Sequence, residues 1–265
     1  MTAPYAWPRG YALKEFDVID STNEEARRLV AAGETGPIWI WAARQSAGRG
    51  RRGRAWESPV GNLAATLLLR PARSPAEAAQ LSFVAALSAS DMVQSFAPGM
   101  RVAVKWPNDV LADGKKIAGI LLESASRGGG PLDWLAVGIG VNLAYHPEGT
   151  EFPATSLADL GEAVPPARDA LLRLASHWAK WYEDWRVQGF APIRDAWLAR
   201  AAQIGGRIRA RLQNEETSGV FEGIDETGAL ILRETQDRTR VIGRVKCSSE
   251  GVRMLLVIDA GNTNI

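Results

Sequence analysis

Residues 37–69 read PIWIWAARQSAGRGRRGRAWESPVGNLAATLLL, and this stretch decides the fold. Both ends, residues 37–43 and 63–69, are short apolar runs of the kind that buried β-strands have, so we predict a strand at each. Residues 44–59 between them are polar, basic and interrupted by glycines, which predicts a loop that joins the two strands.

The flanking sequence continues the α/β pattern. We predict further strands at residues 16–19, 102–106, 117–123 and 134–141, and helices at 22–32 and 74–96. After Pro165 and Pro166 a helix begins in which Trp178, Trp181 and Trp185 recur at spacings of three and four, and we interpret this stripe as core packing. The pattern favours a mixed sheet with helices mainly on one face.

Composition changes near the C-terminus. Short alternating segments from residue 205 to about 252 predict a small antiparallel β-barrel of about fifty residues. Residues 254–265, MLLVIDAGNTNI, read as a strand that opens a new domain. We therefore expect a first domain at 1–204, the small barrel at 205–253 and the start of a further domain at 254–265.

Composition excludes several classes of protein. Of the 265 residues, 46% are hydrophobic and 23% charged, which is ordinary for a globular chain and unlike a disordered or collagenous one. Lys and Arg number 31 against 30 Asp and Glu, so any attraction to anions must be local. No apolar run approaches the roughly 20 residues of a membrane helix, and residues 1–10 lack a signal peptide's apolar centre. We expect a cytoplasmic protein, consistent with the single cysteine, Cys247.

The local exception is the loop itself. Residues 44–54 hold five arginines, three glycines and no acid, and we call this segment the arginine-glycine loop. Glycine lets backbone N–H groups turn toward an anion, and arginine supplies planar charged forks that suit phosphate or carboxylate. A nucleic-acid contact and a merely solvated loop remain as alternatives.

Two familiar patterns match the loop superficially. Gly48 to Gly53 fits the dinucleotide pattern G-x-G-x-x-G, but a strand and not a helix is predicted after it. The same spacing fits a P-loop, but Arg54 and Ala55 stand where Lys and Ser or Thr would be needed. We therefore do not expect a Rossmann site or an ordinary NTPase.

Four separated segments, taken in order, resemble the biotin protein ligases. They are residues 20–23 (DSTN), 45–54 (QSAGRGRRGR) with Trp56, 105–109 (KWPND) with 116–119 (KIAG), and 138–142 (GIGVN). The resemblance extends from about residue 14 to 252. It implies a catalytic domain related to class II aminoacyl-tRNA synthetases, which joins biotin to ATP as biotinyl-AMP. It also implies transfer of the biotin to a lysine of a biotin carboxyl carrier protein, the acetyl-CoA carboxylase subunit.

The resemblance also implies roles for single residues. As catalytic residues it implies Arg51, Lys116 and Asp109. As biotin-binding residues it implies Ser21, Thr22, Asn23, Gln45, Gly48, Arg49, Gly50, Arg51 and Lys116. As ATP-binding residues it implies Arg49, Arg51, Arg52, Arg54, Trp56, Asn108, Asp109 and Asn142. It implies Mg²⁺ as well, with Asp109 as a candidate ligand.

Taken without the resemblance, several of these residues have ordinary structural interpretations. Residues 20–22 are good helix caps, and Asn108 with Asp109 is a common turn. Lys116 would be a charged residue at the start of a strand, and Gly138 and Gly140 would be glycines of a core strand.

The arginine-glycine loop carries one further expectation. Like charges and glycines favour a mobile loop when the site is empty, and we expect this loop to close over the acyl-adenylate and exclude water.

Other functions stay in view. Lipoate ligase belongs to the same fold group, although the glycine-arginine pattern favours biotin. Family members that repress transcription carry a winged helix, and residues 1–13 are too few for one, so we expect no DNA partner and no membrane partner. A nucleic-acid-binding module would use the loop arginines. A serine hydrolase fits worse, because only His146 and His177 exist and no G-x-S-x-G elbow is present.

Two expectations concern assembly and the end of the chain. Exposed edge strands allow a homodimer. Residues 254–265 resemble the opening of type III pantothenate kinases, in which an acid such as Asp259 lies near ATP-bound magnesium, so a fused kinase is expected to begin there.

Overall fold

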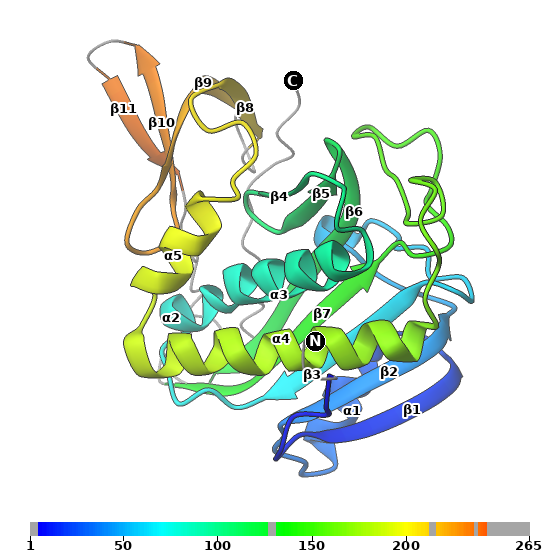
Figure 1. Cartoon of the computed structure of the whole chain (residues 1–265). Helices are drawn as coiled ribbons and strands as arrows, with labels where there is room; N and C mark the ends of the chain where they lie inside the picture. The colour runs from blue at the N-terminus through cyan, green and yellow to red at the C-terminus, as the bar shows by residue number, and fades with distance from the viewer. Residues whose placement is uncertain (1–4, 127–130, 212–215, 236–237, 243–265) are drawn as a thin grey trace.

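The computed structural model describes residues 5–126, 131–211, 216–235 and 238–242 (Figure 1). A seven-stranded sheet forms its centre, in the order β1-β2-β3-β7-β6-β5-β4. The strands are β1 (Ala12–Ile19), β2 (Ile38–Gln45), β3 (Leu63–Leu69), β4 (Val102–Lys105), β5 (Asp109–Ala112), β6 (Lys115–Ser126) and β7 (Leu132–Val141). β1 and β2 are parallel and the other neighbours antiparallel, so the predicted mixed sheet is confirmed.

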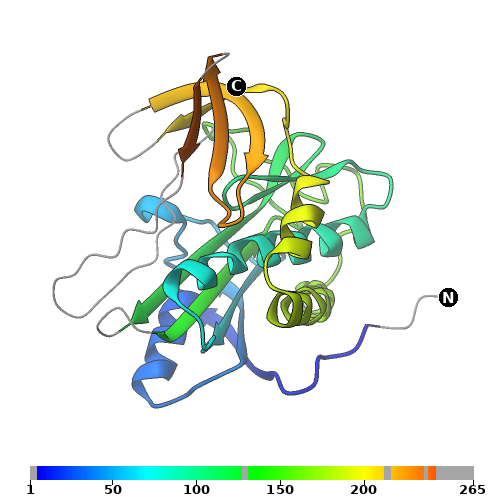
Figure 2. The ribbon, with the colours of Figure 1, turned by 90° about the vertical axis from the view of Figure 1, so that its left-hand side faces the viewer.

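The helices are distributed unequally over the two faces of this sheet (Figures 1 and 2). α1 (Thr22–Ala31) packs on one face, against a small cluster that includes Ile38, Ile40 and Leu68. The main core, which includes Trp39, lies on the other face under α2 (Pro75–Ala79), α3 (Leu81–Phe96), α4 (Ala167–Gln188) and α5 (Ala191–Leu198). The alternation of neighbouring residues between the two clusters follows from the two-residue period of a strand. Helices mainly on one face were predicted, and this is confirmed.

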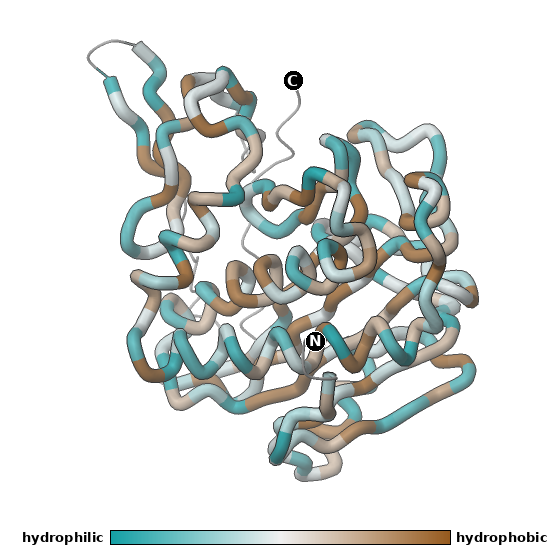
Figure 3. Tube along the Cα trace, in the orientation of Figure 1, coloured by the Kyte–Doolittle hydropathy of each residue, from teal (hydrophilic) through white to brown (hydrophobic). Residues whose placement is uncertain are grey.

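The tryptophan stripe of α4 is part of the main core, as expected. Trp178 is fully buried and packs edge-to-face on Trp39, with 6.3 Å between the ring centroids. Trp185 is also buried, and its indole N–H donates to Gln80 over 3.0 Å. Figure 3 shows that hydrophobic residues concentrate on the central strands and on α3. Among the described residues, no helix is long and apolar enough to cross a bilayer.

Two local predictions were wrong. The single helix expected at 74–96 is divided at Gln80 into α2 and α3, and Ser74 with Glu77 forms a capping box at its start. β5 was not predicted, because residues 107–116 were interpreted as a turn. Asp113 and Gly114, both at positive φ, form a tight turn that lets β5 pair with β6.

A second sheet follows α5, with strands β8 (Arg207–Arg211), β9 (Glu216–Ile224), β10 (Leu230–Thr235) and β11 (Arg238–Ile242). The four strands are antiparallel in the order β11-β10-β9-β8. The prediction of a closed barrel is wrong for the described residues, because β8 and β11 are the two edges of an open sheet.

The small sheet is not a separate body. Its Ile208, Phe221 and Leu230 belong to the same hydrophobic cluster as α3 and the large sheet. The indole N–H of Trp106, just after β4, donates to the carbonyl of Gly228 over 3.0 Å. The predicted third domain at 254–265 and Cys247 lie outside the described residues, so those expectations stay predictions.

Candidate active site

A pocket opens on the α1 face of the large sheet, where α1 begins. Strands β3, β6 and β7 form its floor with small residues, the start of α1 closes one end, and residues 45–56 pass over it. The space between the lining atoms, counted out to the mouth, is about 470 Å³.

Two glycines of β7 make the floor flat. A Cβ atom on Gly138 would collide with the side-chain amide of Asn23, and one on Gly140 would collide with the indole of Trp56. Gly119 of β6 lies under the same indole. These glycines therefore let two polar or aromatic side chains lie directly on the sheet.

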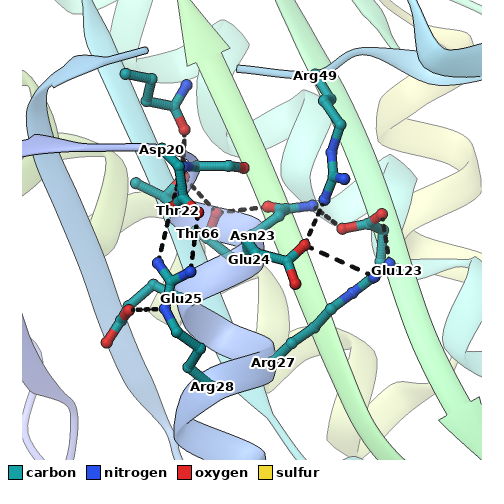
Figure 4. Close-up of polar contacts among 12 residues, drawn as sticks. Asp20, Thr22, Asn23, Glu24, Glu25, Arg27, Arg28, Arg49, Thr66 and Glu123 are labelled. Carbon is teal, nitrogen blue, oxygen red and sulfur yellow. Dashed lines mark hydrogen bonds and ion pairs between the residues drawn. The ribbon is translucent and has the colours of Figure 1, made fainter. Parts of the chain in front are cut away.

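The start of α1 supplies fixed polar groups (Figure 4). The backbone N–H of Thr22 donates to Oε1 of Gln45 over 2.8 Å, and the Thr22 hydroxyl lies 3.0 Å from the same oxygen. Asn23 lies between Thr66 of β3 and Glu123 of β6, at 2.6 and 2.8 Å. The hydroxyl of Ser21, which is 4% exposed, makes no hydrogen bond within the described residues and does not cap the helix.

The arginine-glycine loop makes backbone hydrogen bonds within itself and an ion pair with α1. The N–H of Gly50 donates to the carbonyl of Arg54, and the N–H of Trp56 donates to that of Gly48, at 2.7 and 2.9 Å. Arg49 forms an ion pair of 2.8 Å with Glu24, in the first turn of α1. The loop therefore contributes Arg49 to the residues that line the pocket.

Arg51 and Arg54 of the loop contact residues outside α1. Arg51, in a short 3₁₀ turn (Arg51–Gly53), donates from Nη1 to Oδ1 of Asn108 over 3.1 Å. Arg54 lies 3.6 Å from Glu151 and is largely exposed. The backbone of Arg52 is in the same 3₁₀ turn, and its side chain lies outside what the structure describes.

A buried charge cluster borders the pocket. Nζ of Lys116 lies 2.6 Å from Oδ1 of Asp109 and 5.6 Å from the ring centre of Trp56. Lys105 pairs with Asp109 in the β4–β5 ladder, and its ammonium lies 3.5 Å from the ring centre of Phe152. Burial lowers the pKa of Lys105 to about 8, with Asp109 opposing the shift.

Most of the predicted site residues meet at this pocket. Those that line it are Ser21, Thr22, Asn23, Gln45, Arg49, Gly50, Trp56, Asn108 and Lys116. Gly48, Arg51 and Asp109 do not line it, but each contacts a residue that does. Asn142 is buried and uses its amide to donate to the carbonyl of Thr155 over 3.0 Å, and Arg54 contacts Glu151. Neither of these two lines the pocket, although the carbonyl of Arg54 accepts from the N–H of Gly50, which does.

Sequence reasoning missed three residues of the site: Thr66, Glu123 and Arg27. Thr66 and Glu123 are buried, and Glu123 also forms an ion pair of 2.9 Å with Arg27. The available signal was a single acid in the apolar run 117–123, since a buried carboxylate needs a partner. The partner is 96 residues away in sequence, so no local pattern could identify it.

The two histidines lie away from the pocket. His146 lies 3.8 Å from Asp159, and His177 lies 3.9 Å from Asp91 on the α3–α4 side. Neither lines the pocket, which gives the serine hydrolase alternative no support. Among the described residues, no three His, Cys, Asp or Glu side chains form a metal-binding group.

The comparisons with known proteins agree with this geometry. Residues 15–142 match the family described as Biotin/lipoate A/B protein ligase family, and residues 204–243 match the Biotin protein ligase C terminal domain.

A relative from Paracoccus denitrificans, named biotin--[acetyl-CoA-carboxylase] ligase, is 52% identical over 221 residues, which are 81% of this chain and 91% of the relative. The Aquifex aeolicus biotin protein ligase in complex with biotin and ATP is similar with a TM-score of 0.75 at 26% identity, covering 94% of this chain and 97% of the other. The Leishmania major biotin protein ligase in complex with biotinyl-5-AMP has a TM-score of 0.60 at 25% identity, covering 89% and 99%.

Proposed function

The chain belongs to the biotin protein ligase family, and from this premise we propose that its pocket joins biotin to ATP and passes the biotin to a carrier lysine. The observation that carries the proposal is the convergence of three separated motifs. Residues 21–23, 45–56 and 108–119 contribute side chains to one pocket, as a two-substrate site requires. The acceptor is a biotin carboxyl carrier protein, in line with the name of the Paracoccus relative.

The proposed position of biotin follows from its chemistry. Its ring system is largely apolar with one polar ureido group, and the polar start of α1 suits that group. Gly138, Gly140 and Trp56 offer the apolar surfaces on which the rings would lie. The carboxylate end would then lie toward Lys116 and the arginine-glycine loop.

The first step brings two anions together. A carboxylate oxygen of biotin attacks the α-phosphorus of ATP, a new P–O bond forms, and pyrophosphate leaves. Arg49, Arg51 and Lys116 lie around the place where the two would meet, and cations held there offset the repulsion. The ion pair with Asp109 keeps Lys116 at the edge of the pocket.

The second step is aminolysis. The amine of the carrier lysine attacks the acyl carbon, an amide forms, and AMP leaves with the acyl phosphate's bridging oxygen. The mixed anhydride reacts with water in the same way, so the loop must exclude water before the carrier arrives. The contact between Arg49 and Glu24 is one that holds the loop over the pocket.

Mg²⁺ would supply charge neutralisation on the departing pyrophosphate. Proteins usually hold this ion through one or two carboxylates together with substrate phosphates, so the lack of a three-carboxylate group among the described residues is compatible with it. Asp109 is the carboxylate at the nucleotide end of the pocket. It would be the protein ligand of the ion, and in the structure its Oδ1 contacts Nζ of Lys116.

The test is a transfer assay. The protein is incubated with biotin, ATP, Mg²⁺ and a biotin carboxyl carrier domain, and the carrier is weighed for the mass of one biotinyl group on lysine. Omission of ATP and the Arg51→Ala variant are the controls. A carrier domain specific for lipoate, supplied with lipoate in a parallel reaction, tests the lipoate alternative. Transfer of lipoate but not biotin would overturn the proposal.

A further inference from the structure

Glu123 is a buried acid for which the proposed reaction has no use. It lies on β6, on the face that α1 covers, and is 6% exposed. One oxygen accepts from Nη2 of Arg27 over 2.9 Å, and the other accepts from Nδ2 of Asn23 over 2.8 Å (Figure 4). A buried charge is costly, so an acid at this place needs a reason beyond packing.

The carboxylate fixes the orientation of the Asn23 amide. An ionised carboxylate only accepts hydrogen bonds, so Asn23 must turn its NH₂ group toward Glu123. The amide oxygen of Asn23 then faces the hydroxyl of Thr66, at 2.6 Å. That oxygen also only accepts, so the single proton of the Thr66 hydroxyl points to Asn23.

The orientation of the Thr66 hydroxyl in turn affects Thr22, which lines the pocket. Oγ1 of Thr66 lies 2.8 Å from Oγ1 of Thr22, and with its own proton committed it can only accept from Thr22. The Thr22 proton therefore goes either to Thr66 or to Oε1 of Gln45, which lies 3.0 Å away. In both cases the proton stays within the protein, and Thr22, which lines the pocket, presents a lone pair to the ligand.

We propose that Glu123 is a positioning and specificity-determining residue: by making Thr66 a second acceptor for the Thr22 proton beside Gln45, it keeps Thr22 a hydrogen-bond acceptor for a ureido N–H of biotin. Glu123 would act through Asn23 and Thr66, since it is not itself among the residues that line the pocket. The free hydroxyl of Ser21 complements it, because a donor is needed for the ureido carbonyl. The inference rests on the proposed function, since it concerns how the same pocket recognises biotin.

The experiment compares wild type, Glu123→Gln and Glu25→Gln by calorimetry. The titrants are biotin, biotin methylated on either ureido nitrogen, and ATP. Glutamine keeps the size of Glu123 but lets its amide donate, so the Asn23 amide and the Thr66 hydroxyl are no longer held in one orientation. Glu25 is the matched control, because it forms an ion pair of 2.6 Å with Arg28 on the same helix, outside the pocket lining.

We expect Glu123→Gln to weaken biotin binding at least fivefold and to leave ATP binding within twofold. Of the two methylated biotins, one will bind wild type more weakly than the other. The ratio of its dissociation constant to that of biotin should be smaller in Glu123→Gln than in wild type, by a similar factor. Glu25→Gln should change none of these. Unchanged biotin affinity in Glu123→Gln, or an equal loss for biotin and ATP, overturns the inference. If wild type does not bind biotin, the proposed function itself is contradicted, and this result is distinct from a failure of the inference about Glu123.

A second pair of variants covers the case in which Glu123→Gln does not fold. Thr66→Val keeps the shape of the buried side chain but removes the hydroxyl that connects Asn23 to Thr22, whereas Thr66→Ser keeps the hydroxyl. Thr66→Val should show the same selective loss of biotin affinity, and Thr66→Ser should recover most of it. Equal behaviour of the two variants would contradict the proposed relay.

Discussion

At the scale of single residues, three cations at the pocket each have a polar partner within the protein. Arg49 contacts Glu24, Arg51 contacts Asn108, and Lys116 contacts Asp109. Side chains that are already oriented lose less conformational entropy when a substrate arrives, so more of the binding energy is available for catalysis. A substitution that removes one of these cations is also expected to leave its partner side chain without that contact.

Arg51→Ala should lower the rate of biotinyl-AMP formation at least tenfold. A charge-assisted hydrogen bond contributes about 1.5–3 kcal/mol, and the variant loses it where two anions meet. Pyrophosphate release under single-turnover conditions measures the rate. Arg51→Lys keeps the charge but not the planar fork, so it should fall between wild type and Arg51→Ala. A rate unchanged in Arg51→Ala would remove this residue from the catalytic set.

Lys105 makes stability depend on pH in a defined direction. Its pKa is about 8 in the folded protein and near 10.5 when unfolded, so between these values the unfolded chain holds the extra proton. The free energy of unfolding therefore gains a component that rises with pH in this window, by up to about 1.4 kcal/mol per unit. The charged groups that act on it are Asp109, Lys116 and Glu151.

Urea unfolding of ligand-free wild type and Lys105→Met at pH 7.5, 8.5 and 9.5 measures this component as the difference between the two proteins. The free energy of unfolding of wild type, relative to that of the variant, should increase as the pH rises, because the variant has no proton to lose at this position. Parallel curves across the three conditions would show that Lys105 titrates normally.

At the scale of elements, the floor strand β7 shows why glycine is needed. Gly140→Ala should push the Trp56 indole off the sheet and move the loop that carries Arg49 and Arg51. We expect at least a tenfold loss of adenylate formation and a cost of about 1–3 kcal/mol in the free energy of unfolding, as for other overpacked sites. Gly99→Ala is the matched control, because a Cβ there meets open space. Equal activities of the two variants would contradict this account of the floor.

The loop between β2 and β3 should become protected when the site fills. Trypsin cleaves after arginine, and the arginine-glycine loop has five such sites within eleven residues. Biotin together with ATP should slow cleavage within residues 44–54 at least fivefold, because Arg49 and Arg51 would then hold anions. Cleavage sites in β8 serve as the internal reference. An unchanged rate within the loop would refute closure over the adenylate.

The sequence predicts what depends on neighbouring residues and misses what depends on distant ones. The strand at 63–69 was predicted to the residue, because leucine or alanine occupies every position except Thr66. β5 was missed because four residues give little periodicity, and its pairing depends on the turn at Asp113 and Gly114. In the site, motifs identified the polar residues that line the pocket, whereas Thr66 and Glu123 act through contacts across 43 and 100 residues.

At the scale of the whole molecule, the two sheets share one core. Phe83 of α3 contacts Phe190 and Trp197 edge-to-face, and Trp197 contacts Phe221 of β9 in the same way. Gly228 fits against the Phe83 ring in a backbone conformation with positive φ. The β9–β10 turn is thus seated among aromatic rings next to the segment that carries Asn108 and Asp109.

Trp106→Phe should weaken this connection. It leaves the buried Gly228 carbonyl without the indole N–H, at a cost of about 1–3 kcal/mol. Denaturant unfolding followed by far-UV circular dichroism should give a single transition for wild type and a lower midpoint for the variant. Trp7→Phe loses a comparable hydrogen bond to the Tyr11 carbonyl far from the small sheet, so it serves as control. Equal midpoints of the two variants would mean that the sheets are joined by the aromatic rings alone.

The pairing of β3 with β7 brings residues 63–69 against 135–141, in the middle of the large sheet. During synthesis on the ribosome, the vitamin's binding surface therefore lacks its floor until residue 141 has left the exit tunnel. A chain that stops before residue 141 lacks this floor, so we expect it neither to consume nucleotide nor to release the reactive anhydride.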